Sequence, residues 1–273
     1  MNKKDISELE KIAHEVRKLT ISMIVKAHAS HIGSSYSIVE MLVYLYEKVL
    51  KINPKKPNDP DRDRFILSKG WGISAVYSML ALKGFFSKKL LQEYCLDGSK
   101  LIGGSTRNGI PGIEATTTSM GHGFPIGVGM ALAGKLQKRK YKVYVIISDG
   151  ELDEGSTWES ILIAGHHKLD NLIVLVDYNK WQAFGRTKNV LDIDPLVDKF
   201  KAFNWNAYEI DGHIFKDLEK AFSPKSLAKD RPNVIIAHTV KSKGLSTMED
   251  KLEWHYQTPR EKEQAEAREK GLL

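Results

Sequence analysis

The sequence predicts an α/β fold in which a parallel sheet carries helices on both faces. Three observations support this prediction. Short runs rich in β-branched residues recur along the chain, helical periodicity fills the segments between the later runs, and the runs are apolar at almost every position. Strands that are apolar on both sides belong in a parallel sheet buried under helices, and such sheets bind ligands at the carboxyl ends of their strands.

Spacing and composition predict the individual elements in chain order. Apolar residues three and four apart predict helices near 5–27, 36–50, 73–83 and 122–138. Runs of β-forming residues predict strands at 64–68, 142–148, 172–177, 205–210 and 233–239. Helical segments separate the last four strands, at 154–168, 194–203 and 214–222, and a charged amphipathic segment at 259–272 predicts a final helix. We therefore expect a single domain over residues 1–273.

Composition excludes several classes of protein. The chain has 273 residues, of which 42% are hydrophobic, so it can bury a full core. It lacks an apolar run of about 18 residues, and its polar start lacks the apolar segment of a signal peptide, so we expect a soluble, cytoplasmic protein that does not enter membranes. The one cysteine, Cys95, excludes an intrachain disulfide framework. The 41 basic residues are interspersed with 34 acidic ones, which argues against nucleic acid as a partner.

Polar residues follow two neighbouring strands of the predicted sheet. The strand 142–148 runs into Asp149-Gly150, and the strand 172–177 is followed closely by Asn179. A carboxylate and an amide oxygen at adjacent strand ends are hard ligands that suit Mg²⁺ or Ca²⁺, and Gly150 lets the backbone approach a phosphate. An Asp-Gly pair after a strand is also an ordinary turn signal. The residues alone therefore leave both a turn and a metal-diphosphate site open.

The same segment carries a resemblance to a known family. Asp149-Gly150, followed thirty positions later by Asn179, resembles the GDG…N signature of thiamine-diphosphate enzymes, and residues 149–179 are very similar to the amino-terminal subunit of split, two-gene transketolases. The resemblance implies thiamine diphosphate as cofactor, with Asp149, Asn179 and the main-chain carbonyl of Trp181 as ligands of Mg²⁺, for which Ca²⁺ can substitute. It places Gly150 and Glu151 beside the diphosphate.

The resemblance extends over nearly the whole chain. His31, in KAHASHIGS, stands where a transketolase histidine faces the reacting centre, and the resemblance implies that it shuttles protons. Met120 and Gly121 are expected near the cofactor, and His255, in EWHY, is expected at the mouth of the site as both a catalytic and a cofactor-contacting residue. Four glycines after this region are instead predicted to serve close helix packing: Gly123, Gly127, Gly129 and Gly134.

Two positions depart from the family pattern. Trp71 stands where transketolases carry a histidine after Ser-Lys-Gly, and Gly104 aligns with a second family histidine. In the family these histidines contact hydroxyl groups of the donor sugar. Because a site built to pair hydroxyl groups discriminates strongly against analogues that lack them, their loss predicts a changed substrate preference.

The resemblance implies a subunit that transfers a two-carbon unit from a ketose or a 2-oxo acid to a sugar or sugar phosphate. It also implies a separate pyrimidine-binding partner subunit, which supplies the glutamate that activates the cofactor, in a heterotetramer. One alternative is a pyruvate-using acyl transferase or dehydrogenase-type subunit with the same cofactor. Another is a non-catalytic cofactor-binding scaffold, or a generic nucleotide-binding domain, against which the lack of a GxxxxGK[ST] loop argues.

Overall fold

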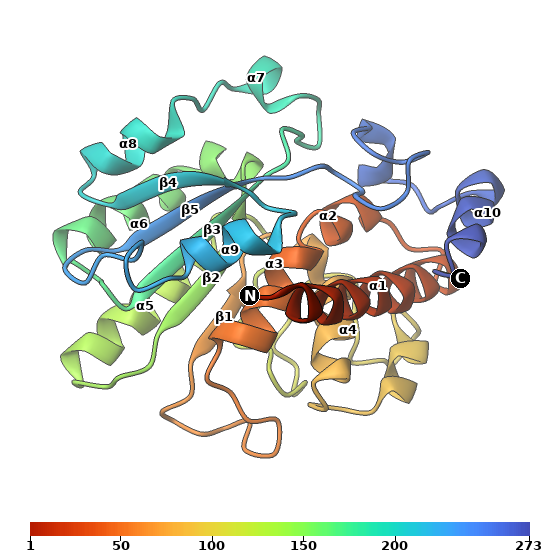
Figure 1. The fold of residues 1–273 in the computed structure, drawn as a ribbon, viewed down its shortest axis with the longest axis horizontal. Helices are drawn as coiled ribbons and strands as arrows, with labels where there is room; N and C mark the ends of the chain where they lie inside the picture. The colour runs from red at the N-terminus through yellow and green to blue at the C-terminus, as the bar shows by residue number, and fades with distance from the viewer.

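The computed structural model describes residues 1–273 and contains a five-stranded sheet in the order β1-β2-β3-β5-β4 (Figure 1). The strands are β1 (Arg64–Leu67), β2 (Val143–Ser148), β3 (Leu172–Tyr178), β4 (Asn206–Asp211) and β5 (Asn233–His238). Every neighbouring pair is parallel, and Ser148 of β2 lies in register with Asp177 of β3. The predicted parallel sheet is confirmed, and each strand lies within one residue of its expected bounds.

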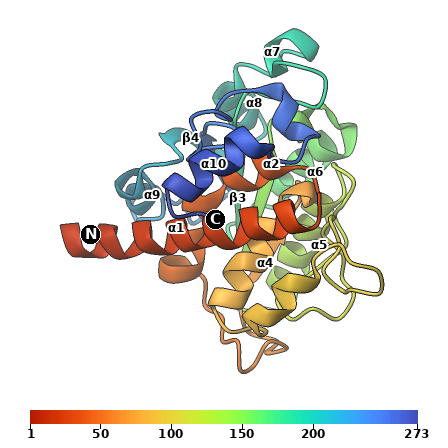
Figure 2. The ribbon, with the colours of Figure 1, turned by 90° about the vertical axis from the view of Figure 1, so that its right-hand side faces the viewer.

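Helices connect and cover these strands. The α-helices are α1 (Lys3–Lys26), α2 (Ile32–Tyr36), α3 (Val39–Tyr44), α4 (Ile73–Leu82), α5 (Gly123–Leu136), α6 (Gly155–His166), α7 (Thr187–Val190), α8 (Leu196–Ala202), α9 (Phe215–Ala221) and α10 (Glu261–Glu269). The shorter helical turns are η1 (Leu45–Val49), η2 (Gly70–Gly72), η3 (Lys88–Glu93), η4 (Gly150–Asp153) and η5 (Leu252–His255). The C-terminal helix α10 lies beside α1 in both views (Figure 1, Figure 2).

One predicted helix is interrupted. The segment expected to be helical over 36–50 consists of the end of α2, the short helix α3 and the π-helical turn η1. The break falls between Tyr36 and Val39, where the Ser37 hydroxyl donates a 2.7 Å hydrogen bond to the buried carboxylate of Asp177. This bond anchors the chain at the break to the end of β3, a contact with a distant segment that helical spacing alone does not reveal.

The core forms two apolar layers, one on each face of the sheet. Along β2, Tyr144 and Ile146 join the layer that contains α1, α3, α4 and α9, while Val143 and Val145 join the layer that contains α5, α6 and α8. Successive side chains of a strand point to opposite faces, so a strand that is buried on both sides must be apolar throughout. The expectation of helices on both faces is confirmed.

Close packing explains most of the glycines in α5. A Cβ on Gly127 would lie 2.7 Å from Val145 Cγ2, one on Gly134 would lie 2.8 Å from the Tyr141 ring, and one on Gly123 would lie 2.7 Å from Ser68 Cα. For these three glycines the packing prediction is confirmed. For Gly129 it is wrong, because a Cβ there would meet nothing within 4 Å.

Cys95 is exposed and forms no disulfide. None of the helices combines the length and apolar character that a membrane crossing requires.

Candidate cofactor site

A cavity of about 590 Å³ opens at the carboxyl ends of β2 and β3. This is the edge at which parallel α/β sheets bind ligands. Six of the residues predicted from the sequence line the cavity: His31, Met120, Gly150, Asn179, Trp181 and His255. They come from five separate stretches of the chain, so the fold brings together residues up to 224 positions apart, the difference between 255 and 31.

Asp149 is fully buried behind the cavity lining, between the lining residues Ser148 and Gly150, and its carboxylate connects two strand ends. Its Oδ1 accepts a hydrogen bond from the Gly150 N–H at 2.9 Å, and its Oδ2 accepts from the Lys180 N–H at 2.6 Å and from the Thr187 hydroxyl at 3.1 Å. All three donors are neutral. Burial, reinforced by the negative charge of Asp177, raises the pKa of Asp149 to about 7. A buried carboxylate with only neutral donors is a site that a bound cation would stabilise.

Glu151 and Gly121 lie behind the cavity surface and are joined by a hydrogen bond. Glu151 Oε1 accepts hydrogen bonds from the Gly121 N–H at 3.1 Å and from the Ser68 hydroxyl, while its Oε2 has no partner. Burial raises the pKa of Glu151 to about 7. Gly121 has a φ of 71°, and a Cβ there would lie 2.5 Å from Ser156 Oγ, so this turn requires glycine.

Hydrogen bonds and a cation–π contact fix the side chains of Asn179 and Trp181. The Asn179 Oδ1 accepts from the Trp181 N–H at 3.0 Å. The Trp181 indole donates to Asp250 at 2.8 Å, and its ring lies 3.9 Å from the guanidinium carbon of Arg186. No group of three or more His, Cys, Asp and Glu residues is arranged to hold a metal. A divalent cation could instead combine one carboxylate with an amide oxygen and a main-chain carbonyl oxygen, which is the set that Asp149, Asn179 and Trp181 offer.

Two buried lysines also line the cavity, and neither was predicted from the sequence. Lys69 forms an ion pair with Asp177. Lys241 is only 1% exposed, and its Nζ lies 3.1 Å from His255 Nδ1 without a carboxylate in salt-bridge range. Burial, together with the charge of Lys69, lowers the pKa of Lys241 to about 8. A buried cation without an acidic partner favours an anion in the cavity. The signal in the sequence was the lysine that follows the last strand, in TVKSKG.

The rings of the two candidate catalytic histidines lie edge to face. The ring centroids of His31 and His255 are 5.2 Å apart, and His31 Nδ1 lies 2.6 Å from Ser30 Oγ. Burial, and next the charge of Lys241, lowers the pKa of His31 to about 4 and that of His255 to about 3. Both imidazoles are therefore neutral near pH 7 and can accept a proton.

Trp71 and Gly104, the two departures from the family pattern, lie in different surroundings. The Trp71 indole lines the cavity and stacks on His31, with ring centroids 4.5 Å apart and an interplanar angle of 15°. Gly104 does not line the cavity, and a Cβ there would lie 2.6 Å from the Thr118 side chain. Only Trp71 is therefore placed to contact a ligand in this cavity.

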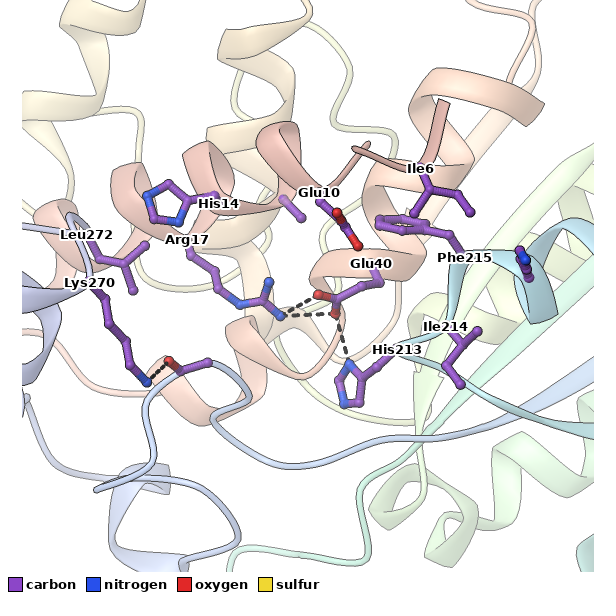
Figure 3. Close-up of a pocket in the computed structure, with 13 residues that line it drawn as sticks. Ile6, Glu10, His14, Arg17, Glu40, His213, Ile214, Phe215, Lys270 and Leu272 are labelled. Carbon is purple, nitrogen blue, oxygen red and sulfur yellow. Dashed lines mark hydrogen bonds and ion pairs between the residues drawn. The ribbon is translucent and has the colours of Figure 1, made fainter. Parts of the chain in front are cut away.

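A second cavity, of about 640 Å³, lies beside α1 and the loop that leads into α9 (Figure 3). At its base Glu40 accepts from Arg17 at 2.7 Å and pairs with His213 Nδ1 at 2.9 Å. His213 Nε2 accepts the Val240 N–H at 2.8 Å, and the His213 backbone N–H donates to Asp211 at 2.8 Å, which closes a turn. These groups satisfy one another, so we assign them to structure.

The cofactor-site residues lie within a region that a family model matches. The model is described as transketolase, thiamine diphosphate binding domain, and it matches residues 9–271. The chain belongs to the transketolase family. The family and the α/β fold expected from the sequence are both confirmed, and the transketolase match agrees with the expected enzyme class. The match also supports thiamine diphosphate as the cofactor.

Curated relatives of transketolase type cover most of the chain. A 6-deoxy-6-sulfo-D-fructose transketolase subunit, SqwG, from Clostridium sp. (strain MSTE9) is 42% identical over 91% of this chain and 90% of its own length. One subunit of an apulose-4-phosphate transketolase, from Phocaeicola vulgatus, is 37% identical over 96% of this chain and 93% of its own length. Both relatives are named as subunits and have nearly the same extent as this chain.

Solved transketolases share the fold but are longer. The transketolase from Campylobacter jejuni superposes with a TM-score of 0.92 at 29% identity, and the match covers 99% of this chain and 43% of that one. The transketolase from Leishmania mexicana gives a TM-score of 0.90 at 28% identity and is covered over 41% of its length. The chain thus spans about two fifths of the solved transketolases that it matches.

Proposed function

We propose that this chain is the thiamine-diphosphate- and Mg²⁺-binding subunit of a two-subunit transketolase, which transfers a two-carbon unit to a sugar-type carbonyl acceptor. The observation that carries the proposal is the charge arrangement at the carboxyl edge of the sheet. Asp149 is a buried carboxylate with only neutral donors, and Lys241 is a buried cation without an acidic partner. A metal ion and a diphosphate together would satisfy both groups.

Some residues in and behind the cavity lining would bind the metal ion, and others would contact the cofactor. Asp149, Asn179 and the Trp181 carbonyl would hold Mg²⁺, or Ca²⁺ in its place, because they supply oxygen ligands only. Lys241 and the backbone at Gly150 would bind the diphosphate. Met120 lines the same cavity and would contact the cofactor, while Gly121 and Glu151 would hold the wall behind it. When bound, thiamine diphosphate supplies the electron sink for cleaving a carbon–carbon bond next to a carbonyl group.

His31 and His255 would move protons at the substrate. Both rings line the cavity and both are neutral near pH 7, so each can accept a proton at one ring nitrogen and donate one at the other. The Lys241 ammonium only donates, so His255 Nδ1 accepts from it and the neutral ring would offer its Nε2–H to the substrate as a donor. His31 Nδ1 can donate to the Ser30 hydroxyl, which would leave its Nε2 free to accept a proton from the substrate.

The partner subunit is part of the same proposal. The relatives named as subunits match this chain over 90% or more of their lengths, which supports a short subunit that works with a second one. We propose that residues 1–273 act as one unit in a cytoplasmic heterotetramer, with a pyrimidine-binding subunit that supplies the activating glutamate. Sugar or sugar-phosphate substrates agree with the names of the relatives.

Calorimetry tests the cofactor assignment. Thiamine diphosphate titrated into the complex of the chain and its partner should bind in the presence of Mg²⁺ and bind at least tenfold more weakly after Asp149→Ala, because one metal ligand and its charge are lost. Asp97→Ala, at an exposed loop position, is the matched control and should bind as the wild type does. Binding that ignores both Mg²⁺ and the Asp149 substitution would refute the proposal.

Trp71 favours a second candidate for the donor. Its indole covers one face of His31 where the family has a hydrogen-bonding histidine, so a 2-oxo acid such as pyruvate becomes a donor to compare with a ketose phosphate. Consumption of each donor by the complex would be measured with and without Trp71→His. Preference for pyruvate, shifted toward the ketose phosphate by the substitution, would support the acyl-transfer variant. Rapid ketose consumption by the wild type would favour the ketol transferase.

A further inference from the structure

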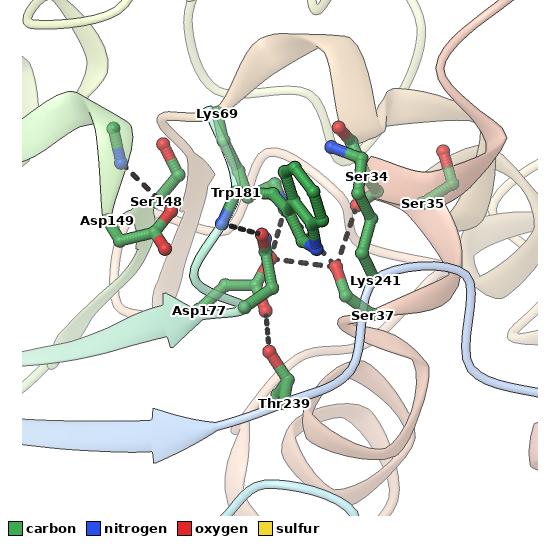
Figure 4. Close-up of polar contacts among 12 residues, drawn as sticks. Ser34, Ser35, Ser37, Lys69, Ser148, Asp149, Asp177, Trp181, Thr239 and Lys241 are labelled. Atoms are coloured by element: carbon green, nitrogen blue, oxygen red, sulfur yellow. Dashed lines mark hydrogen bonds and ion pairs between the residues drawn. The ribbon is translucent and has the colours of Figure 1, made fainter. Parts of the chain in front are cut away.

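Asp177, at the end of β3, is fully buried and accepts four hydrogen bonds behind the cofactor cavity (Figure 4). The donors are the Lys69 ammonium, the Thr239 hydroxyl, the Ser37 hydroxyl at 2.7 Å and the Asn179 Nδ2 at 3.0 Å. They come from four different segments of the chain. Lys69 offsets the cost of burying the carboxylate, which would be large without a cation.

The bond from Asn179 decides how its side-chain amide lies. A carboxylate only accepts hydrogen bonds, so the NH₂ end of Asn179 must face Asp177. On the other side the Trp181 N–H, which only donates, lies 3.0 Å from Asn179 Oδ1. A flipped amide would set two acceptors against each other at one contact and two donors at the other. Both neighbours therefore select the same orientation.

We propose that Asp177, held in place by its ion pair with Lys69, is a positioning residue that orients Asn179 so that its side-chain oxygen is presented to the divalent cation. Asp177 acts through Asn179 and contacts neither substrate nor cofactor. The inference rests on the proposed function, because it assigns the cation to Asn179. It adds a role for a buried ion pair that the ligand set itself does not use.

Two matched double variants isolate the orienting bond. Asp177→Asn with Lys69→Met keeps an oxygen that can accept from Asn179 Nδ2, whereas Asp177→Leu with Lys69→Met removes it. Both variants remove the ion pair as a whole and leave the same net charge. The Mg²⁺ concentration that half-saturates thiamine diphosphate binding should be about tenfold higher for the leucine variant than for the asparagine variant. Calorimetry on the complex of the chain and its partner measures this, with melting temperatures as the check on folding.

Two further variants separate orientation from general damage. Thr239→Val removes one donor to Asp177 but leaves the bond to Asn179, so it should lower the melting temperature and leave the Mg²⁺ requirement unchanged. Asn179→Asp in the leucine background should restore Mg²⁺ affinity, because a carboxylate presents an oxygen in either orientation. Equal Mg²⁺ requirements for the two double variants, or no rescue by Asn179→Asp, would overturn the proposal.

Exchanging the Asp and Asn side chains at positions 177 and 179 provides a second test if the leucine variant does not fold. Asn179→Asp alone sets two carboxylates 3.0 Å apart and should weaken Mg²⁺ binding. Adding Asp177→Asn restores a donor between the two positions and should recover the binding, and a failure to recover would contradict the orienting role. A wild-type complex that binds the cofactor without Mg²⁺ would instead refute the proposed function.

Discussion

At the scale of single residues, Lys241 places the strongest constraint on what the cavity can bind. It is buried, lines the cavity, and has a histidine nitrogen rather than a carboxylate beside its ammonium group. Burying an unpaired charge is unfavourable, and a bound anion would offset this penalty. Lys241 is therefore expected to lower the stability of the ligand-free protein and to raise its affinity for a diphosphate.

Replacing Lys241 should separate these two effects. In Lys241→Met, thiamine diphosphate with Mg²⁺ should bind at least tenfold more weakly, because a buried charge-assisted contact is lost. The melting temperature without ligand should stay level or rise, because an unpaired buried charge is removed. Lys180→Met, at an exposed position beside the site, is the control. Calorimetry and thermal unfolding measure the two quantities, and equal affinities of the variant and the wild type would contradict the role.

The lowered pKa values of His31 and His255 predict a pH dependence with a definite sign. The pKa of each histidine is near 6.5 in the unfolded chain, but burial, and next the charge of Lys241, lowers it to about 4 for His31 and about 3 for His255 in the native protein, where Lys69 also faces both rings. The unfolded chain therefore binds more protons between these values, so their contribution to stability is present above pH 6.5 and is lost as the pH falls.

Histidine NMR titration and denaturant unfolding check this prediction. The His31 and His255 ring signals should show no protonation between pH 8 and about pH 5, which lies well above both lowered values. The free energy of unfolding of the wild type, relative to His255→Gln, should fall as the pH is lowered below 6.5. A native titration near pH 6.5 for either ring would show that the burial and lysine charges do not act as described.

At the scale of elements, strand ends place the site and helix packing holds the strands. β2 and β3 end within one residue of each other, so the residues that follow them, Asp149 and Asn179, lie at the same edge of the sheet. The helix α5 approaches β2 closely only because Gly127 has no side chain to strike Val145. The geometry of the site thus depends on a helix that contributes no side chain to it.

Two glycines on α5 provide a matched pair to test this packing. Gly127→Ala should destabilise the protein by about 1–3 kcal/mol, because the new methyl group would overlap a side chain of β2. Gly129→Ala should stabilise it by about 0.5–1 kcal/mol, because the position is helical and open, and alanine restricts the unfolded chain. Denaturant unfolding measures both changes, and changes of equal sign would contradict the packing model.

At the scale of the whole molecule, the cofactor cavity opens toward the exterior through large apolar side chains. Phe184 lines it and is 84% exposed, Trp71 is 43% exposed and Tyr256 is 57% exposed. The chain covers only about two fifths of the solved transketolases that it matches. An exposed aromatic rim on a short subunit fits the proposed contact with a partner that closes the cavity.

Phe184→Ala should therefore weaken the complex with the partner subunit by tenfold or more, since exposed aromatic side chains are frequent hot spots of interfaces. Leu136→Ala is the control, because Leu136 is 74% exposed at the far end of α5 and does not line the cavity. Sedimentation or calorimetry of the two subunits measures the affinity. An unchanged affinity for Phe184→Ala would place the partner elsewhere.

Much of the fold was predictable because it depends on local signals. The strands followed from runs of β-forming residues. The helix expected over 36–50 is broken beside Ser37, whose hydroxyl bonds to Asp177, 140 positions away. The packing role of Gly129 was mispredicted for a related reason. Spacing within a helix does not tell which glycine faces the sheet and which faces solvent.

The alternation of strands and helices, and the sheet edge at which Asp149 and Asn179 lie, could be read from the amino-acid sequence, because apolar runs and strand-end residues are local properties. Tertiary structure alone decided the electrostatics: that Lys69 is neutralised by Asp177, that Lys241 is not neutralised, and that Trp71 covers His31. The physical reason is that burial and charge pairing depend on which distant segments come together, and these set the energies of the ionised groups.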